Sequence, residues 1–194
     1  MNIGFFERGY LPIKVVRLAA DILTDYGGKL ADIACGKGVL LKEVEHHGNK
    51  SVIGIDLAPD QLAISKANGM TVVRGSIFEM PFKDGKFDIS VCFNTLYNFL
   101  SLSTLEPVFR EMARIIRMDG KIVIDIRNNR NILLNIKYWL HMKRGKHPTI
   151  SHSLEEINAL MEQNGCSLAQ KKAVGFNNPY IAWGYILIYE KKAR

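Results

Sequence analysis

Hydrophobic and polar positions along this chain follow helical and strand spacing in a regular order. Apolar residues recur every three or four positions over 11–26 and a pair of glycines follows, which predicts an amphipathic helix. Short apolar runs at 29–35 and 51–57 predict two buried strands, and the amphipathic segment 37–48 between them predicts a helix. The chain therefore begins with a helix followed by a strand–helix–strand unit.

The same alternation continues as far as residue 127. It predicts helices over 59–69 and 104–120 and strands over 70–75, 87–94 and 121–127. Regular alternation of strands and helices is typical of a mostly parallel sheet covered by helices on both faces.

The end of the chain breaks this alternation. Ser153 and Glu156 have the spacing of a capping box at the start of a helix over 153–165, and two strands, 167–176 and 180–190, then follow directly. We expect these strands to pair as an antiparallel hairpin at the edge of the sheet. The prediction is a doubly wound α/β fold of seven strands, mostly parallel, in a single domain spanning 1–194.

Composition and charge narrow the classes of protein. With 47% hydrophobic and 23% charged residues, the chain has the makeup of a folded globular protein and not of a disordered one. No stretch reaches the roughly 20 apolar residues of a membrane span, and Cys35, Cys92 and Cys166 have no metal-ligand spacing. We expect a cytoplasmic protein without a bound metal, and the net charge of +7 favours an anionic partner without identifying one.

Gly36 and Gly38 lie where the first predicted strand turns into its helix. A parallel sheet presents backbone N–H groups to ligands at this place, so the pair indicates either a nucleotide site or a tight turn alone. The segment lacks the spacing and hydroxyl of a triphosphate loop, and Leu41 replaces the third glycine of a dinucleotide site. Asp32 would repel a pyrophosphate but stabilise an ammonium group, so we expect a ligand with a cationic head.

A second acid, Asp56, ends the second predicted strand. A carboxylate there can accept hydrogen bonds from both hydroxyls of a ribose, and the alternative is that it caps the following helix. Asp32 and Asp56 together favour a nucleoside with a cationic end.

Four segments resemble the motifs of one protein family and occur in the same order as in that family. They are LADIACGKGVLL, VIGIDLAPDQLAISK, VVRGSIFEMPFKDGKFDISVCFNTLYNF and VFREMARIIRMDGKIVIDI, and the terminal strand pair resembles the family's edge hairpin. The chain resembles the class I S-adenosylmethionine-dependent methyltransferases, within them the small-molecule type similar to ubiquinone-biosynthesis methyltransferases. The resemblance covers nearly the whole chain and implies a Rossmann-like fold, S-adenosylmethionine as cofactor and S-adenosylhomocysteine as product.

The resemblance also implies roles for individual residues. Those implied to hold the cofactor are Asp32, Ala34, Gly36 and Gly38 at the methionine end, Asp56 at the ribose, Leu57, Ser76, Ile77 and Phe78 around the adenine, and Asn94 near the sulfonium. Ser76 stands where the family commonly has an acid that accepts from the adenine amino group. A hydroxyl accepts a weaker hydrogen bond than a carboxylate does.

Methyl transfer from a sulfonium needs positioning more than it needs a side-chain nucleophile. The residues that we expect to face the acceptor follow the fourth and fifth strands: Asn94, Tyr97 and Asn98, then Asp125, Arg127 and Asn128. The histidines that can act as bases are His141, His147 and His152, although a surface position is the simpler interpretation, and His46 and His47 are expected to be solvated.

An insert over 128–152 is the most distinctive part of the chain. No acid occurs between Asp125 and Glu155, while six lysines and arginines do. Two apolar stripes lie nearly opposite on a helical wheel: Ile132, Leu133, Ile136, Trp139 and Leu140, and Leu134, Tyr138 and Met142. One hypothesis is that one stripe packs on the body of the protein and the other forms a lid over the acceptor pocket, where the cations would contact an anionic group of the substrate. The alternative is that the insert forms a dimer contact or extra core.

The predicted function is methyl transfer to a small-molecule acceptor that is anionic or apolar. Nucleic-acid methylation is the first alternative, although NTLY replaces the [N/D]-P-P-[Y/F] motif after the fourth strand. A nicotinamide reductase is disfavoured because the Tyr-x-x-x-Lys match at Tyr10 and Lys14 lies on the first helix. A non-catalytic S-adenosylmethionine-binding module and a homodimer both stay open.

Overall fold

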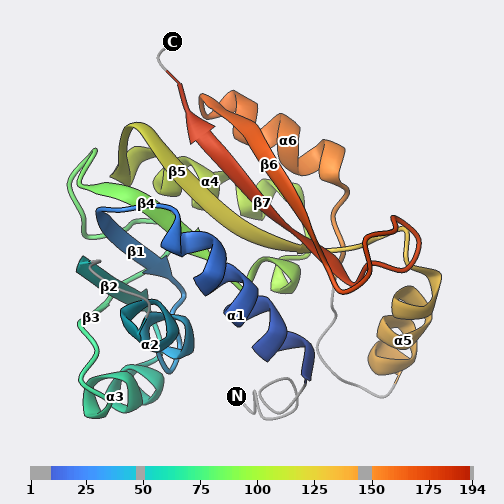
Figure 1. Ribbon diagram of the computed structural model, residues 1–194, viewed down its shortest axis with the longest axis horizontal. Coiled ribbons are helices and arrows are strands. Elements are labelled where there is room, and N and C mark those ends of the chain that lie inside the picture. The colour runs from blue at the N-terminus through green and yellow to red at the C-terminus, as the bar shows by residue number, and fades with distance from the viewer. Residues whose placement is uncertain (1–9, 47–50, 144–149, 193–194) are drawn as a thin grey trace.

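The computed structural model describes residues 10–46, 51–143 and 150–192, which form a seven-stranded sheet between two layers of helices (Figure 1). The first elements are α1 (Tyr10–Thr24), β1 (Lys29–Ile33), α2 (Val39–His46), β2 (Ser51–Asp56), α3 (Pro59–Ala67) and β3 (Val72–Arg74). Then come β4 (Phe87–Cys92), the 3-10 turn η1 (Leu96–Asn98), α4 (Leu102–Ile115), β5 (Ile116–Arg127), α5 (Ile132–Lys143), α6 (Leu154–Gln163), β6 (Cys166–Val174) and β7 (Gly184–Lys191).

The strand order is β3-β2-β1-β4-β5-β7-β6. The first five of these strands are parallel to one another, and β7 is antiparallel to both β5 and β6. The predicted doubly wound α/β fold with seven strands and an antiparallel C-terminal hairpin is therefore confirmed.

The core has two layers because the central strands are buried on both faces. Adjacent residues Leu30 and Ala31 of β1 are both fully buried, but Leu30 packs among the residues of α1 and α2, whereas Ala31 packs among those of α4 and α6. α3 packs beside β2 and β3 at the edge of the sheet.

Some element boundaries differ from the prediction. The pattern predicts helix as far as residue 120, but α4 ends at Ile115 and β5 begins at Ile116, since both isoleucines are buried and periodicity does not separate the two states there. β5 is irregular in this region, where Asp119 has a φ of 61° and the pairing with β4 shifts register. α1 spans 10–24 and not 11–26, and the hairpin loop extends over 175–183.

The start of α6 matches the predicted capping box. The backbone N–H of Glu156 donates to Ser153 Oγ at 3.1 Å, and the backbone N–H of Ser153 donates to Glu156 Oε2 at 2.8 Å. Within the described ranges, no helix is both long and apolar enough to cross a membrane.

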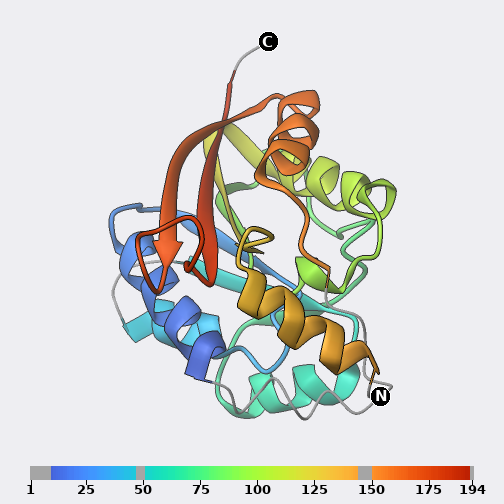
Figure 2. The same cartoon turned by 90° about the vertical axis from the view of Figure 1, so that its right-hand side faces the viewer.

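The carboxyl ends of the parallel strands meet at one edge of the sheet. Figure 2 views the molecule from this side, with α5 lying across the front, α1 and α2 on one flank and α4 and α6 on the other. This edge carries the residues predicted to bind a ligand.

Candidate active site

The turn that follows β1 has an unusual backbone. Ala34, Gly36 and Gly38 have φ values of 59°, 53° and 74°, in the left-handed region that non-glycine residues rarely adopt. The backbone N–H of Cys35 donates to Ile55 of β2 at 3.0 Å, which fixes the turn to the sheet. A Cβ added at Gly36 would meet no atom within 4 Å, so this turn faces open space.

Asp56 at the end of β2 is fastened to this turn. Its Oδ2 accepts from the backbone N–H of Gly36 at 2.8 Å, and its Oδ1 accepts from the backbone N–H of Ala58 at 2.9 Å. Ala58 is the N-cap residue of α3, and α3 has no side-chain cap, so Asp56 holds the turn before the helix and does not cap the helix itself. A carboxylate has about four acceptor positions, which leaves capacity for ribose hydroxyls.

Asp32 of β1 is almost completely buried, with 3% of its surface exposed. Burial, and then the negative charge of Asp56, raise the pKa of Asp32 to about 8. An ammonium group beside Asp32 would stabilise the charged form of this carboxyl. The buried carboxyl therefore fits the cationic amino-acid end of S-adenosylmethionine.

Ser65 is a residue of this site that the sequence pattern did not reveal. It is fully buried on α3, and its hydroxyl donates to the carbonyl oxygen of Gly36 at 2.9 Å. A Cβ added at Gly38 would lie 2.9 Å from Ser65 Oγ, so the second glycine allows α3 to pack against the turn. Nothing in the helical periodicity of 59–69 distinguishes this serine from a surface one.

Two exposed apolar side chains lie beside the strand ends where the adenine is expected. Leu57 exposes 63% of its surface and Phe78 exposes 47%, and Phe78 meets the ring of Phe99 edge-on at 6.0 Å. Ser76 Oγ accepts from the backbone N–H of Phe78 at 3.2 Å, while Ile77 packs partly against the core. The hydroxyl of Ser76 therefore shapes this loop and keeps an acceptor position for a ligand.

A buried polar network joins the ends of β4 and β5. The backbone N–H of Asn94, a residue with a φ of 55°, donates to Asp125 Oδ1 at 2.6 Å, and Arg127 Nη2 donates to Asn94 Oδ1 at 3.0 Å. Arg127 Nη1 lies 3.5 Å from Asp125 Oδ2, and both side chains are at least 97% buried. The Arg127 guanidinium lies 4.5 Å from the ring centroid of Tyr97.

Burial raises the pKa of Asp125 and the pKa of Tyr97, with Arg127 opposing the shift in each case. Tyr97 is therefore a neutral phenol at ordinary pH, able to exchange hydrogen bonds but not to act as a preformed phenolate base. Asp125 Oδ2 has no hydrogen-bond partner within the part of the chain that the structure describes.

Tyr138 of α5 belongs to the same cluster, although the sequence marks it only as part of an apolar stripe. It is 7% exposed, and burial raises its pKa while the nearby Arg127 opposes that shift. α5 thus covers the network from the solvent side, in agreement with its place in Figure 2.

The other candidate residues lie elsewhere or have different partners. The side-chain amide of Asn128 donates to the carbonyls of Pro179 and Ala182, so it fastens the hairpin loop and does not face the network. Asn98 and His46 are exposed, and His152 Nε2 lies 3.0 Å from the carbonyl oxygen of Phe99. His47, His147 and the side chain of His141 lie outside the described residues.

Two further observations concern possible metal ligands and the thiols. Among the described side chains, no three histidines, cysteines or acids group together as metal ligands would. Cys92 and Cys166 are buried and Cys35 is partly buried, and burial raises the pKa of all three thiols.

Comparison with known proteins agrees with this geometry. A family described as "Methyltransferase domain" matches residues 31–124. Over 98 residues the chain is 29% identical to "Demethylmenaquinone methyltransferase" of Corynebacterium kroppenstedtii and 26% identical to "Probable tRNA methyltransferase 9B" of Bos taurus. Each match covers 50% of this chain but only 41% and 21% of those relatives, respectively.

Two solved structures have the same fold. The magnesium protoporphyrin IX methyltransferase of Synechocystis, solved with S-adenosylhomocysteine, aligns with 92% of this chain and 83% of its own at 14% identity and a TM-score of 0.76. An S-adenosylmethionine-dependent methyltransferase of Methanosarcina mazei aligns with 86% of this chain and 93% of its own at 16% identity and a TM-score of 0.71. Residues 31–124 therefore match a methyltransferase domain, and the chain has the fold of the solved S-adenosylmethionine-dependent methyltransferase.

Proposed function

We propose that this protein transfers a methyl group from S-adenosylmethionine to a small-molecule acceptor. The observation that carries the proposal is the pair of neighbouring carboxylates, Asp32 and Asp56, at the open turn around Gly36. Asp32 would hold the ammonium group and Asp56 the ribose. Leu57 and Phe78 would cover the two faces of the adenine, which would explain why the protein itself leaves both apolar side chains exposed.

The cofactor supplies the methyl group as an electrophile on its sulfonium sulfur. The chain's own residues then have to orient the acceptor and exclude water. Asn94 ends β4 in a strained left-handed conformation that Asp125 fixes through the 2.6 Å hydrogen bond, so its backbone is held rigidly beside the cofactor turn. Tyr97 and Tyr138 would form the far wall of the acceptor space.

The charge at this wall favours an apolar acceptor over an anionic one. The Arg127 guanidinium lies 4.5 Å from the centroid of the Tyr97 ring, but its charge is balanced by Asp125 at 3.5 Å and its Nη2 is bonded to Asn94. A cation whose charge is already balanced inside the protein attracts a further anion only weakly. The aromatic rings of Tyr97 and Tyr138 offer apolar contact area instead.

RNA is the second candidate acceptor. It is favoured by the similarity to "Probable tRNA methyltransferase 9B" and by the acid-free stretch between Asp125 and Glu155, which would attract phosphates.

One labelling experiment separates these candidates. The purified chain is incubated with methyl-labelled S-adenosylmethionine and either an organic extract of small molecules or total RNA, with the Asp56→Asn variant as a control that loses cofactor affinity. We expect label in the organic fraction with the wild-type chain alone. Label in the RNA would support the second candidate, and binding of S-adenosylhomocysteine without transfer to either fraction would indicate a non-catalytic module.

A further inference from the structure

One side of α5 carries an apolar stripe that faces solvent. Because successive helical residues lie about 100° apart, five residues fall on this side: Ile132, Leu133, Ile136, Trp139 and Leu140. Each exposes between 43% and 76% of its surface. The other side of α5 is seated on the body of the protein through Tyr138, which is buried, and Leu134, which is partly buried.

The hairpin loop between β6 and β7 lies beside the start of α5 and also exposes apolar side chains. Tyr180 and Ile181 expose 69% and 46% of their surface. The loop is fastened to the segment before α5, because Asn128 donates to the carbonyls of Pro179 and Ala182 at 2.8 and 2.9 Å and Asn131 donates to that of Ala182 at 3.1 Å. We call the five exposed residues of α5, with Tyr180 and Ile181, the α5 patch.

Cations border the α5 patch. Lys137 is exposed at the edge of the stripe, and Lys143 lies at its carboxyl end with Nζ 5.7 Å from the ring centroid of Trp139. The sequence has no acid between Asp125 and Glu155 to balance these charges. A group of exposed apolar side chains with a cationic border is typical of an interaction site and differs from singly scattered apolar residues.

We propose that the α5 patch docks on an anionic phospholipid surface, with α5 lying in the plane of the headgroups. Leucine, isoleucine and tryptophan on one side and lysines at the border are the makeup of helices that bind in the membrane interface. The lysine stems can reach outward so that their ammonium groups meet lipid phosphates while the apolar residues enter the acyl boundary.

A second copy of the chain fits the patch less well. A twofold contact would enclose Lys137 and Lys143 of each copy at the border of the interface, and the acid-free stretch offers no carboxylate to pair with them. Docking on lipid concerns the surface of α5 and stands independently of the methyl-transfer chemistry.

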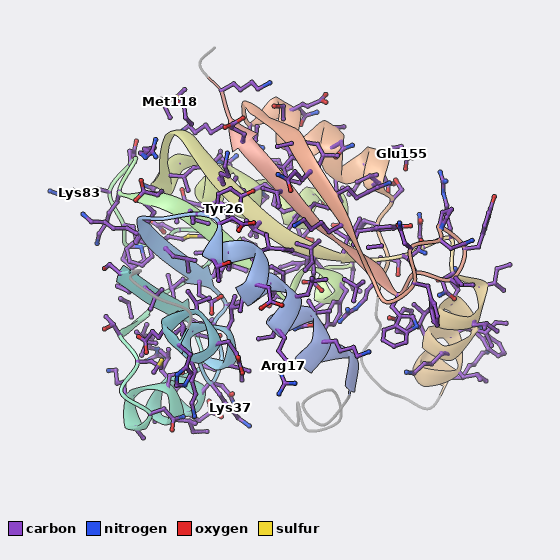
Figure 3. All side chains as sticks on the ribbon, in the orientation of Figure 1. Arg17, Tyr26, Lys37, Lys83, Met118 and Glu155 are labelled. Atoms are coloured by element: carbon purple, nitrogen blue, oxygen red, sulfur yellow. The ribbon has the colours of Figure 1, made fainter. Side chains whose placement is uncertain are left out.

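Vesicle flotation with the full chain tests the proposal. We expect binding to phosphatidylcholine vesicles that contain phosphatidylglycerol, much weaker binding to phosphatidylcholine alone, and release by salt. Lys137→Gln should weaken binding about fivefold, the worth of one lysine near an anionic surface, and Ile136→Asp should weaken it more than about tenfold. Lys83→Gln and Met118→Asp are matched controls, since Figure 3 places both residues at the opposite end of the molecule from α5.

A fluorescence measurement checks that α5 itself is the contact. The chain has two tryptophans, so Trp183→Phe leaves Trp139 as the reporter, and its emission should shift to the blue and resist an aqueous quencher when phosphatidylglycerol vesicles are added. The proposal is overturned by absence of vesicle binding, by equal losses in the control variants, or by binding that leaves Trp139 open to quencher. It is also overturned if sedimentation equilibrium finds a dimer that Ile136→Asp dissociates while no vesicle binds.

Discussion

The backbone N–H of Gly36 donates a hydrogen bond to Asp56 Oδ2, 2.8 Å away, and so couples the glycine turn after β1 to the acid that ends β2. This bond orients the carboxylate before any ligand arrives. Preorganisation of this kind lowers the cost of binding, because the groups that contact the ligand are already in place.

Asp56→Asn should weaken S-adenosylhomocysteine binding roughly 10- to 100-fold, since hydrogen bonds to a charged acceptor are worth about 1.5–3 kcal/mol. Isothermal titration calorimetry measures this change. Asp60→Asn, at an exposed acid of α3 bonded to Gln61, is the control and should bind as the wild type does. Equal affinity in the two variants would remove Asp56 from the cofactor site.

The stability of the ligand-free protein should fall as the pH rises from about 4 to about 8. The folded chain keeps the proton of Asp32, whose pKa is about 8, whereas the unfolded chain loses it near 3.8, so the contribution is full at low pH and is lost through this window. The slope reaches about 1.4 kcal/mol per pH unit at most. Urea unfolding across the window should show this slope, and Asp32→Asn should remove it; parallel curves would contradict the assignment.

The same carboxyl should release its proton when the ligand binds. The ligand's ammonium group favours the charged form of Asp32, so binding near pH 7 should liberate up to about one proton. Calorimetry in buffers of different ionisation enthalpy counts this proton, with Asp32→Asn as the reference. If wild type and variant release equal numbers, the ammonium group lies elsewhere.

The two glycines of the turn should respond differently to alanine. Gly36 faces open space, so Gly36→Ala should lower the free energy of unfolding only by the roughly 1–2 kcal/mol that a left-handed alanine costs. The added methyl group should obstruct the ligand and weaken its binding more than about tenfold. Gly38→Ala should lose more stability, because its Cβ would lie 2.9 Å from Ser65 Oγ.

Gly69→Ala is the matched control for both glycine variants. Gly69 has a φ of 82° and open space around it, so the variant should lose stability as Gly36→Ala does yet bind ligand normally. Thermal unfolding and titration with S-adenosylhomocysteine separate the two effects. Normal binding by Gly36→Ala would show that the ligand does not approach this backbone.

Arg127→Met should destabilise the protein by about 3–5 kcal/mol, because it leaves the carboxylate of Asp125 buried and unpaired. The double variant Asp125→Asn/Arg127→Met should lose less than the sum of the single variants. Arg130→Met is the control, since Arg130 and Glu155 form an exposed pair at 3.5 Å that is worth at most about 1 kcal/mol. Chemical denaturation gives all of these values, and equal losses at Arg127 and Arg130 would exclude a buried pair.

The sequence predicted the strands well for a physical reason. Strands such as β1 and β4 are buried on both faces, so each is a short apolar run bounded by polar or glycine residues. The junction of α4 and β5 was predicted wrongly because Ile115 and Ile116 are both buried, one as the end of a helix and the other as the start of a strand. Periodicity carries no information where two buried elements adjoin.

The sequence predicted that Asp32, Gly36 and Asp56 lie close together because they belong to one strand–helix–strand unit, whose parallel strands end at the same edge of the sheet. The proposed acceptor side and α5 depend on tertiary structure. Ser65 reaches the glycine turn from α3, and Arg127 meets Asp125, Asn94 and Tyr97 only because β4 and β5 pair side by side. A helix that is apolar on two sides has two faces it can bury, and only packing against the body decided that Tyr138 is covered while Trp139 faces solvent.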